Sequence, residues 1–535
     1  MPRLLHQISL AAAASVFAVS FAFAPEALAQ KRGGTLVQIT QPEPPTLASY
    51  ISTSGPIGQV TAKIYDGLLE YGFDLKPRPS LAESWDIAAD GKTITFKLRS
   101  GVKFHDGKPF TSEDVKFSII EVLKKAHPRG INTFREVTDI ETPDGGTVVM
   151  KLANPAPYLI TALSGYESPM IPKHVFGTGD IRSHESANKP VGTGPFKFVE
   201  WRRGEFVRLD RNADYWKPGL PYLDRIVVRF IPDSATRTAL MEKGEAHIAG
   251  FGAVPYNDVK KLATLPSIEV TTKGYEMISP VVELLMNTKK PPFDNEKVRQ
   301  AVSYAVDRQF AIDNVWFGFG TPATGPISSN FAPSGIYTAD VRKYDVPNRI
   351  EIANKLLDEA GLPRKADGVR FEIVHDITPY GEEWQRFGEA VQQQLAAVGI
   401  KASLRYEDVA TWLKRVYSDY DFNLSSNFLY NLSDPVIGVH RALHSNSIKQ
   451  GTVFVNGSRW SSPETDEAMN KGTTEFDPAK RATFYHDLQK RAVDAAPIAW
   501  MIELNFPTVI NKRYKDLIVG PLGIYSSYDG AWMER

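Results

Sequence analysis

The alternation of hydrophobic and polar residues predicts several strands in the first half of the chain. Residues 35–39 follow a Gly-Gly pair and alternate as one strand. Apolar residues alternate again on both sides of Asp90-Gly91, a sequence typical of a tight turn, so residues 85–98 should form a hairpin. A second strand pair is expected at 136–140 and 147–152.

Apolar residues spaced three and four apart predict helices between and after these strands. Thr111 precedes Asp114 as in a capping box. Gly361 and Gly399 end two of the helices. The predicted helices cover residues 59–69, 115–123, 294–306, 350–360 and 384–398. The last of them leads directly into an alternating run at 400–404, and this order of helix and strand favours an α/β region with a partly parallel sheet.

The composition excludes several classes of protein. A chain of 535 residues is long enough for about three domains. The charged fraction of 23% beside 42% hydrophobic residues is that of a folded protein, not a disordered one. Lys and Arg number 62 and so do Asp and Glu, which argues against a nucleic-acid partner. The absence of cysteine excludes disulfides, thiol catalysis and Cys-ligated metal sites.

The N-terminus has the pattern of a secretory signal peptide. Arg3 is followed by an apolar stretch from 8 to 23 and then by Ala27-Leu28-Ala29, an A-x-A cleavage pattern. A membrane anchor is the alternative, but crossing a bilayer takes about 20 apolar residues and this span is shorter. We therefore expect residues 1–29 to be removed after Ala29. The mature protein should be exported, periplasmic in a bacterium with two membranes, and not embedded in the membrane.

Short sequences that resemble nucleotide-binding or catalytic motifs are not supported by the residues around them. Gly91-Lys92-Thr93 resembles the end of a phosphate-binding loop, but the first glycine of that loop is replaced by Asp86. Gly192-Thr193-Gly194 is followed by Pro195 and a predicted strand, unlike a dinucleotide site. The sequence contains no G-x-S-x-G and no H-E-x-x-H. We expect no catalytic residues and no cofactor.

One histidine pair has the spacing of metal ligands. His440 and His444 would share one face of a helix and could bind a metal. The alternative is a solvated or cleft-lining loop, and Arg441 beside them would disfavour a cation. We therefore predict no metal site, and keep a metal- or haem-chelate receptor as an alternative.

Residues 79–118 (PSLAESWDIAADGKTITFKLRSGVKFHDGKPFTSEDVKFS) resemble the signature region of the extracytoplasmic solute-binding proteins of family 5. These proteins are the dipeptide- and oligopeptide-binding components of ABC importers. Further segments resemble the family in the same order along the mature chain, at 64–70, 190–196, 293–308, 357–361 and 394–400.

The resemblance implies an α/β, bilobal periplasmic binding protein fold with an extra domain inserted in lobe I. Lobe I would comprise residues 30–73, 192–285 and 505–535, the inserted domain 74–191, and lobe II 286–504. The expected hinge lies where the chain crosses between lobes, near Leu285 and Asn505. The implied protein is not an enzyme. It is a monomer that captures a peptide or similar solute and delivers it to an inner-membrane ABC permease.

The sequence departs from the family at two charge anchors. Peptide-binding members hold the ammonium terminus with an Asp shortly before an acidic-Pro pair, here Asp434-Pro435, and Asn431 stands at the position of that Asp. An alignment shifted by one to three residues would bring Asp434 itself into that role. Dipeptide-binding members hold the carboxylate with the Arg of an Arg-Pro-Tyr run, and here the run begins with Thr378.

The ligand can therefore be a peptide or a non-peptide solute such as an opine, a sugar-like conjugate, or a metal or haem chelate. Arg441 could hold an anionic group or form a surface salt bridge. An exported hydrolase on the same scaffold is a further alternative, and it would need a convergent acid/base or nucleophile cluster in the cleft. The predicted ligand-binding residues are Tyr430, Asn431, Asp434, Tyr380, Phe428, Trp412, Arg441, Tyr50 and Ser54.

Overall fold

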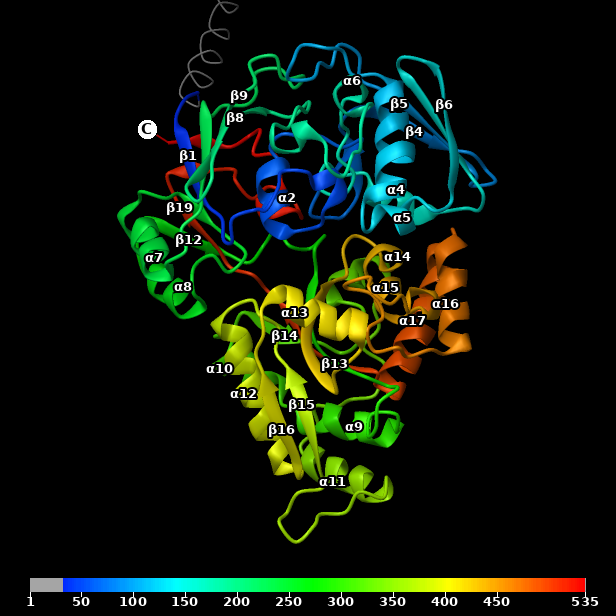
Figure 1. Cartoon of the computed structure of the whole chain (residues 1–535). Helices are drawn as coiled ribbons and strands as arrows, with labels where there is room; N and C mark the ends of the chain where they lie inside the picture. Colours follow the sequence, from blue (N-terminus) through cyan, green and yellow to red (C-terminus); the bar gives the residue numbers. More distant parts are fainter. Residues whose placement is uncertain (1–31, 535) are drawn as a thin grey trace, which may run out of the picture.

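The computed structural model describes residues 32–534, and the predicted signal peptide and its cleavage site lie outside this range. The chain forms two lobes, with a further domain packed beside the first (Figure 1). A large sheet lies at the centre of each of these three bodies.

A seven-stranded sheet forms the first lobe. Strand β1 pairs in parallel with β10 and β11, and its buried side chain Leu36 lies in the lobe's core. The order is β12 (Ile268–Thr271), β19 (Thr508–Asn511), β11 (Ile248–Ala249), β1 (Thr35–Ile39), β10 (Arg225–Arg229), β9 (Phe206–Arg211) and β8 (Phe196–Arg202). The helices of this lobe are α2 (Gly55–Thr61), α7 (Ser234–Lys243) and α8 (Tyr256–Leu262), with the short turns η1 (Ser49–Ile51) and η8 (Gly523–Tyr525).

A four-stranded antiparallel sheet forms the additional domain. Its strands, in spatial order, are β4 (Ala82–Ile87), β5 (Thr93–Leu98), β7 (Thr147–Leu152) and β6 (Val137–Asp144). The hairpin and the second strand pair predicted from alternation are confirmed, and Gly91 adopts the positive φ that the turn requires. The capping box at Thr111 and Asp114 is also present. The helical segments of this domain lie between β5 and β6 and after β7. They are α3 (Ser112–Lys116), the π-helix η2 (Phe117–Leu123), α4 (Lys124–Ala126), α5 (Gly130–Thr133), η3 (Pro157–Ala162), α6 (Lys173–Phe176) and η4 (Glu185–Asn188).

A six-stranded mixed sheet forms the second lobe. Its order is β14 (Gly320–Pro322), β18 (Ile498–Leu504), β13 (Pro280–Met286), β17 (Leu424–Tyr430), β15 (Phe371–Asp376) and β16 (Ile400–Arg405). The helices are α9 (Glu296–Ala305), α10 (Arg308–Asn314), α11 (Arg349–Glu359), α12 (Glu382–Ala397), α13 (Val409–Leu413), α14 (Pro435–Gly438), α15 (His440–Leu443), α16 (Pro463–Thr474) and α17 (Pro478–Ala495), with the π-helix η6 (Lys414–Asp419) and the turns η5 (Ser329–Ser334) and η7 (Ser445–Ser447). The predicted helices 294–306, 350–360 and 384–398 are confirmed to within a few residues, as is the strand that follows Gly399.

Three small pairings complete the described secondary structure. Strands β2 (Leu69–Tyr71) and β3 (Pro77–Pro79) form one antiparallel pair, and β20 (Tyr514–Lys515) and β21 (Trp532–Met533) form another. An isolated bridge joins Lys103 and Pro109 around the predicted Asp106-Gly107 turn.

The predicted helix at 59–69 is wrong over most of its length. Helix α2 ends at Thr61, and β2 begins at Leu69. The backbone carbonyls of Lys63 and Ile64 accept hydrogen bonds from Phe196 and Gly194 instead of continuing a helix. These contacts with a distant segment outweigh the local helical periodicity.

Strand pairing indicates where the chain passes from one lobe to the other. Strand β13 pairs with β17 and β18, so its residues lie in the second-lobe sheet, although the expected boundary at 285 assigns most of them to lobe I. We propose a boundary near residue 279. The chain returns over residues 505–507, between β18 and β19. The sheet of the additional domain lies within the proposed insertion 74–191.

Asp66 joins the first lobe to the segment that returns from the insertion. Its carboxylate accepts hydrogen bonds from Trp216 Nε1 at 2.9 Å and Thr193 Oγ1 at 3.0 Å. Burial raises the pKa of Asp66 to about 6, while the hydrogen bond from Trp216 acts in the opposite direction.

A second buried anchor connects α14 to α17. Both oxygens of Asp434 receive hydrogen bonds from Arg481 at 2.8 Å, and the same carboxylate accepts from the Val436 amide to cap α14. Both side chains are buried or nearly so. The pair fixes the start of α14 on the long helix behind it.

The Asp66→Asn variant should flatten the pH dependence of stability between pH 4 and 6. Because burial raises the folded-state pKa of Asp66 from 3.8 to about 6, the stability gained by protonation is fully present below 3.8 and is lost as pH rises through 6. This loss amounts to roughly 3 kcal/mol. Melting temperatures measured across this range test the effect, with the exposed Asp214→Asn as the control. Equal slopes for Asp66→Asn and wild type would contradict it.

The Asp434→Ala variant should lower the free energy of unfolding by about 3–5 kcal/mol, because it leaves the Arg481 guanidinium buried and unpaired. Urea unfolding of the ligand-free protein measures this loss. The matched control is Asp487→Ala, which removes an exposed ion pair with Arg491 on the same helix α17. A loss below about 1 kcal/mol for Asp434→Ala would show that the pair contributes little.

Candidate functional site

Two parallel strands of the second lobe, β15 and β16, end side by side at Asp376 and Arg405. Strand β17 begins beside the end of β15, where Ser425 lies opposite Asp376, and continues to Tyr430. In open α/β sheets the crevice outside the carboxyl ends of such strands is the usual ligand site. The loops that follow β15 and β17 carry the predicted residues Tyr380 and Asn431.

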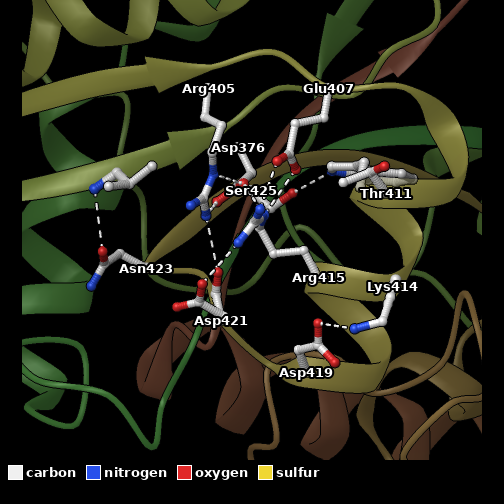
Figure 2. A network of polar contacts seen from close by, with 12 residues as sticks. Asp376, Arg405, Glu407, Thr411, Lys414, Arg415, Asp419, Asp421, Asn423 and Ser425 are labelled. Carbon is white, nitrogen blue, oxygen red and sulfur yellow. Dashed lines mark hydrogen bonds and ion pairs between the residues drawn. The ribbon is translucent and has the colours of Figure 1, made fainter.

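A network of ion pairs holds these strand ends in place (Figure 2). The buried carboxylate of Asp376 accepts hydrogen bonds from Arg405 at 2.6 and 2.9 Å. Arg415, on the π-helix η6, bonds to Glu407 at 2.6 and 2.8 Å and to Asp421 at 2.8 Å. The end of β15 is thus tied to the end of β16, and Arg415, 3.9 Å from Asp376, also ties it to η6, which continues from the helix α13 that carries Trp412.

An aromatic cluster lies beyond the strand ends. Phe428 stacks on Trp384 with ring centroids 5.3 Å apart, and it contacts Tyr380 at 5.9 Å and Tyr430 at 5.6 Å. Tyr380 remains 41% exposed. Trp412 is buried and donates its Nε1 hydrogen to Ser425 Oγ at 3.1 Å, so it supports Tyr380 from beneath.

Aromatic residues of the first lobe and the insertion extend this cluster. Phe251 lies 6.4 Å from Tyr430 and 6.1 Å from Tyr525, and Tyr525 lies 4.7 Å from Tyr166 (ring centroids). The hydroxyl of Tyr166 is buried close to Arg129, and that of Tyr525 is buried close to Gln59. The rings therefore form a continuous aromatic cluster between the lobes.

Two arginines give the site its charge. Arg129 of the insertion is paired with Glu167, with Nε–O distances of 2.8 and 2.9 Å. Arg441 donates only to backbone carbonyls, those of Gly438 at 3.1 Å, Phe454 at 3.3 Å and Tyr430 at 3.3 Å, and no carboxylate within residues 32–534 forms an ion pair with it. Burial, together with the nearby charge of Arg129, lowers the pKa of Arg441 to about 10.

The protein itself satisfies two of the predicted ligand-binding side chains. Asn431 accepts from the Ser328 amide at 2.6 Å and donates to the Pro326 carbonyl at 3.1 Å. Gly438 packs against the Asn431 backbone so closely that a Cβ atom there would lie 2.0 Å from its carbonyl oxygen. Asp434 is occupied by Arg481. We infer that Asn431 and Asp434 position α14 rather than contact the solute as predicted.

The two residues predicted from the first lobe lie in different surroundings. Tyr50 is fully buried, and its ring packs 5.0 Å from Phe176 in the first-lobe core, so it is not exposed to a cleft. Ser54 is partly exposed at the N-cap position of α2, where its side chain makes no capping bond. Its ligand role stays a prediction.

His440 and His444 point to separate partners. His440 lies 3.2 Å from the Tyr485 hydroxyl, and His444 Nδ1 accepts from the Asn446 amide at 3.1 Å. No group of three or more His, Asp or Glu side chains gathers in a metal-binding arrangement within residues 32–534.

A cavity of about 320 Å³ opens beside the aromatic cluster, at the ends of β15 and β16. Glu383 on the adjoining first turn of α12 is close enough to raise the pKa of Tyr256 in the first lobe, although burial is the larger cause. The cavity therefore lies near the boundary between the lobes. Its lining consists of Ile377, Thr378, Pro379, Gly381, Glu382, Gln385, Tyr406 and Glu407.

Sequence reasoning missed five residues of this site. Arg129 and Glu167 lie 38 positions apart, and nothing in the sequence pairs them. Phe251 has a positive φ, which no local pattern indicates for a phenylalanine. Tyr166 and Tyr525 lie in loops or short turns without periodicity, and only the packing of the lobes reveals them.

Comparisons with known proteins agree with this architecture. Residues 76–450 match the family model of bacterial extracellular solute-binding proteins, family 5 middle. The glutathione-binding protein GsiB of Pectobacterium atrosepticum is 30% identical over 88% of this chain and 89% of its own length. Its Escherichia coli K12 counterpart is 29% identical over 96% and 94%.

Two solved structures have the same fold. The periplasmic binding protein DppA of Helicobacter pylori, in complex with the peptide STSA, has a TM-score of 0.80, 25% identity, and coverage of 95% of this chain and 99% of its own. AgaA of A. tumefaciens R10, in complex with agropinic acid, has a TM-score of 0.78 and 28% identity, with 94% and 100% covered. The predicted bilobal α/β class is confirmed. Within residues 32–534 no helix combines the length and apolar character needed to span a bilayer. The chain belongs to the family 5 solute-binding proteins of ABC importers, which are non-enzymatic transport components of the periplasm.

Proposed function

We propose that this chain is a periplasmic receptor that captures a small peptide-like solute with a free carboxylate and passes it unchanged to an inner-membrane ABC permease. The signal peptide 1–29, cleaved after Ala29, would direct its export. The solute would lie between the lobes, among the rings of Phe251, Tyr430 and Tyr380.

The observation that carries this proposal is the unpaired guanidinium of Arg441. The Arg441 guanidinium is partly withdrawn from water, which is costly for a cation unless an anion pairs with it, and here three carbonyl oxygens provide only partial compensation. Arg129 does not compete for the anion, because Glu167 already neutralises it. A carboxylate of the solute would supply the missing counter-charge.

The chemistry at the usual peptide anchors points away from ordinary dipeptides. Thr378 donates its hydroxyl to the Ser426 carbonyl at 2.6 Å, and Asn431 is bonded to the loop 326–328. Neither side chain is left to neutralise a free peptide terminus. A solute with excess negative charge suits such a site, and glutathione, the ligand named for the relative GsiB, has this property.

An opine is the second candidate. AgaA, whose structure holds agropinic acid, is as similar to this chain as the glutathione-binding proteins are. The aromatic lining and the single unpaired arginine would accommodate either an anionic peptide or an anionic sugar–amino-acid conjugate.

Binding would act by a shift in conformational population. A solute held on one lobe favours the closed form only through the contacts that the other lobe adds. Here the added contacts would come from Phe251 and Tyr525 against a solute held by Arg441. The closed, liganded form would then dock on the permease.

Thermal shift and calorimetry with a defined panel test the proposed function. Glutathione, its diamide, agropinic acid and the peptide Ser-Thr-Ser-Ala would each be added to the mature protein. A true ligand stabilises by about 2.7 kcal/mol at a hundredfold excess over Kd, which a melting curve detects. Binding of a free acid with loss of binding for its amide supports the proposal. Equal binding of the amide, or no binding across the panel, contradicts it.

Arg441→Met should weaken binding of the best acid by tenfold or more, because a charge-assisted hydrogen bond contributes about 1.5–3 kcal/mol. Arg441→Lys should retain part of the affinity, since the charge remains. Arg491→Met, on an exposed face of α17, is the matched control and should bind as wild type does. Calorimetry on the four proteins gives the Kd values that test this role. An unchanged Kd for Arg441→Met would exclude pairing between Arg441 and the carboxylate of the solute.

A further inference from the structure

A buried carboxyl group lies beside Arg441 without forming an ion pair with it. Glu283 is in the middle of β13, directly opposite Asn427 on β17 and Trp500 on β18. Only 3% of its surface is exposed. The charge of Arg441 acts on Glu283, but the two side chains make no hydrogen bond or ion pair in the described structure.

The contacts of Glu283 fit a neutral carboxylic acid. Its Oε1 accepts from Asn427 Nδ2 at 3.2 Å, and that nitrogen also lies 2.9 Å from the Tyr417 hydroxyl. Asn427 Oδ1 is buried without a donor. The same heavy-atom positions allow the amide in the opposite orientation. In either orientation the Glu283 carboxyl makes one hydrogen bond and no ion pair in the described structure, and burying such a group costs less when it is neutral than when it is ionised.

A small cavity adjoins this carboxyl group. It has a volume of about 10 Å³ and is bounded by Glu283, Asn431 and Trp500, among others. This is space for about one water molecule. The groups facing Glu283 are Asn427, Tyr417 and Arg441, and of these only Arg441 is charged near neutral pH.

We propose that Glu283 sets the charge of the solute site: it carries a proton when an anionic solute pairs with Arg441, and its ionised form competes with the solute for that arginine. This inference rests on the proposed function. With Arg129 neutralised by Glu167 and Glu283 protonated, the site has one net positive charge. It therefore selects a solute with one unpaired negative group. The proton comes from solvent and adds to a Glu283 carboxylate oxygen, and no other bond changes.

The expected pH dependence follows from the environment of Glu283. Burial raises the pKa of this group to about 8, and the charge of Arg441 opposes that rise only in part. Below pH 8 the group is neutral, and Arg441 is free for the solute. As the pH rises through 8, Glu283 ionises, the net charge of the site falls to zero, and the affinity for an anion decreases.

Calorimetry with glutathione on the wild type and on Glu283→Gln tests this inference. The wild type should take up a fraction of a proton on binding at pH 8, which the difference in binding enthalpy between phosphate and Tris buffers measures. Its Kd for glutathione should rise several-fold between pH 7 and 9. Glu283→Gln should bind as well as wild type at pH 7 and lose both effects. The ionisable groups of the solute contribute equally to binding by both proteins. Any difference in pH dependence between wild type and Glu283→Gln therefore arises from Glu283. Asp66→Asn, a buried acid in the first lobe, is the control and should behave as wild type.

Infrared spectroscopy of the ligand-free protein keeps the two proposals separate. A protonated carboxyl band should disappear between pH 7 and 9 in the wild type and be absent in Glu283→Gln. If glutathione fails to bind, it is excluded as the solute of the proposed function. The infrared band still shows whether the Glu283 carboxyl group is protonated. Absence of the band, or binding with identical pH profiles for wild type and Glu283→Gln, overturns the inference.

Discussion

The proposed site depends on Arg441, whose guanidinium is bonded to backbone carbonyls and forms no ion pair within residues 32–534. A guanidinium held only by carbonyl oxygens is tolerated because the backbone around it is fixed: Gly438 packs tightly on the end of β17, and Asp434 ties α14 to Arg481. A looser loop would move the guanidinium toward water, where it would regain solvation. Under the proposed function, the rigidity of this corner would keep the arginine ready for an anion.

Neighbouring charges are each balanced within their own group, which leaves Arg441 as the exception. Beside the strand ends, Arg405 and Arg415 pair with Asp376, Glu407 and Asp421 (Figure 2), and Lys290 also pairs with Asp421. Arg129 and Glu167 do the same in the insertion. Buried pairs of this kind add little net stability but restrict geometry. Their effect here is to fix the segments that carry the aromatic rings.

The sequence predicted the regular elements better than the site. The hairpin around Asp90-Gly91 and the helices ending near Gly361 and Gly399 follow from local patterns, and the structure contains them. Asn431 was found from a family pattern, but its amide bonds to a loop a hundred residues away. Such long-range partners, like the contact of Tyr166 with Tyr525, depend on how the lobes pack, which no local period encodes.

The inserted domain packs against the segment that leads to Arg441. Val436 and Ile437 of α14 lie in its hydrophobic core cluster, although they come from the second lobe, and α14 contacts both α5 and η3 (Figure 1). The segment that carries Arg441 is therefore held on one side by the insertion and on the other by α17. Any motion that separates the lobes must also part α14 from the insertion, exposing apolar surface. Packing thus favours closure even before a solute adds its charge. Under the proposed function the solute would pair with Arg441, which the protein itself bonds only to carbonyl oxygens.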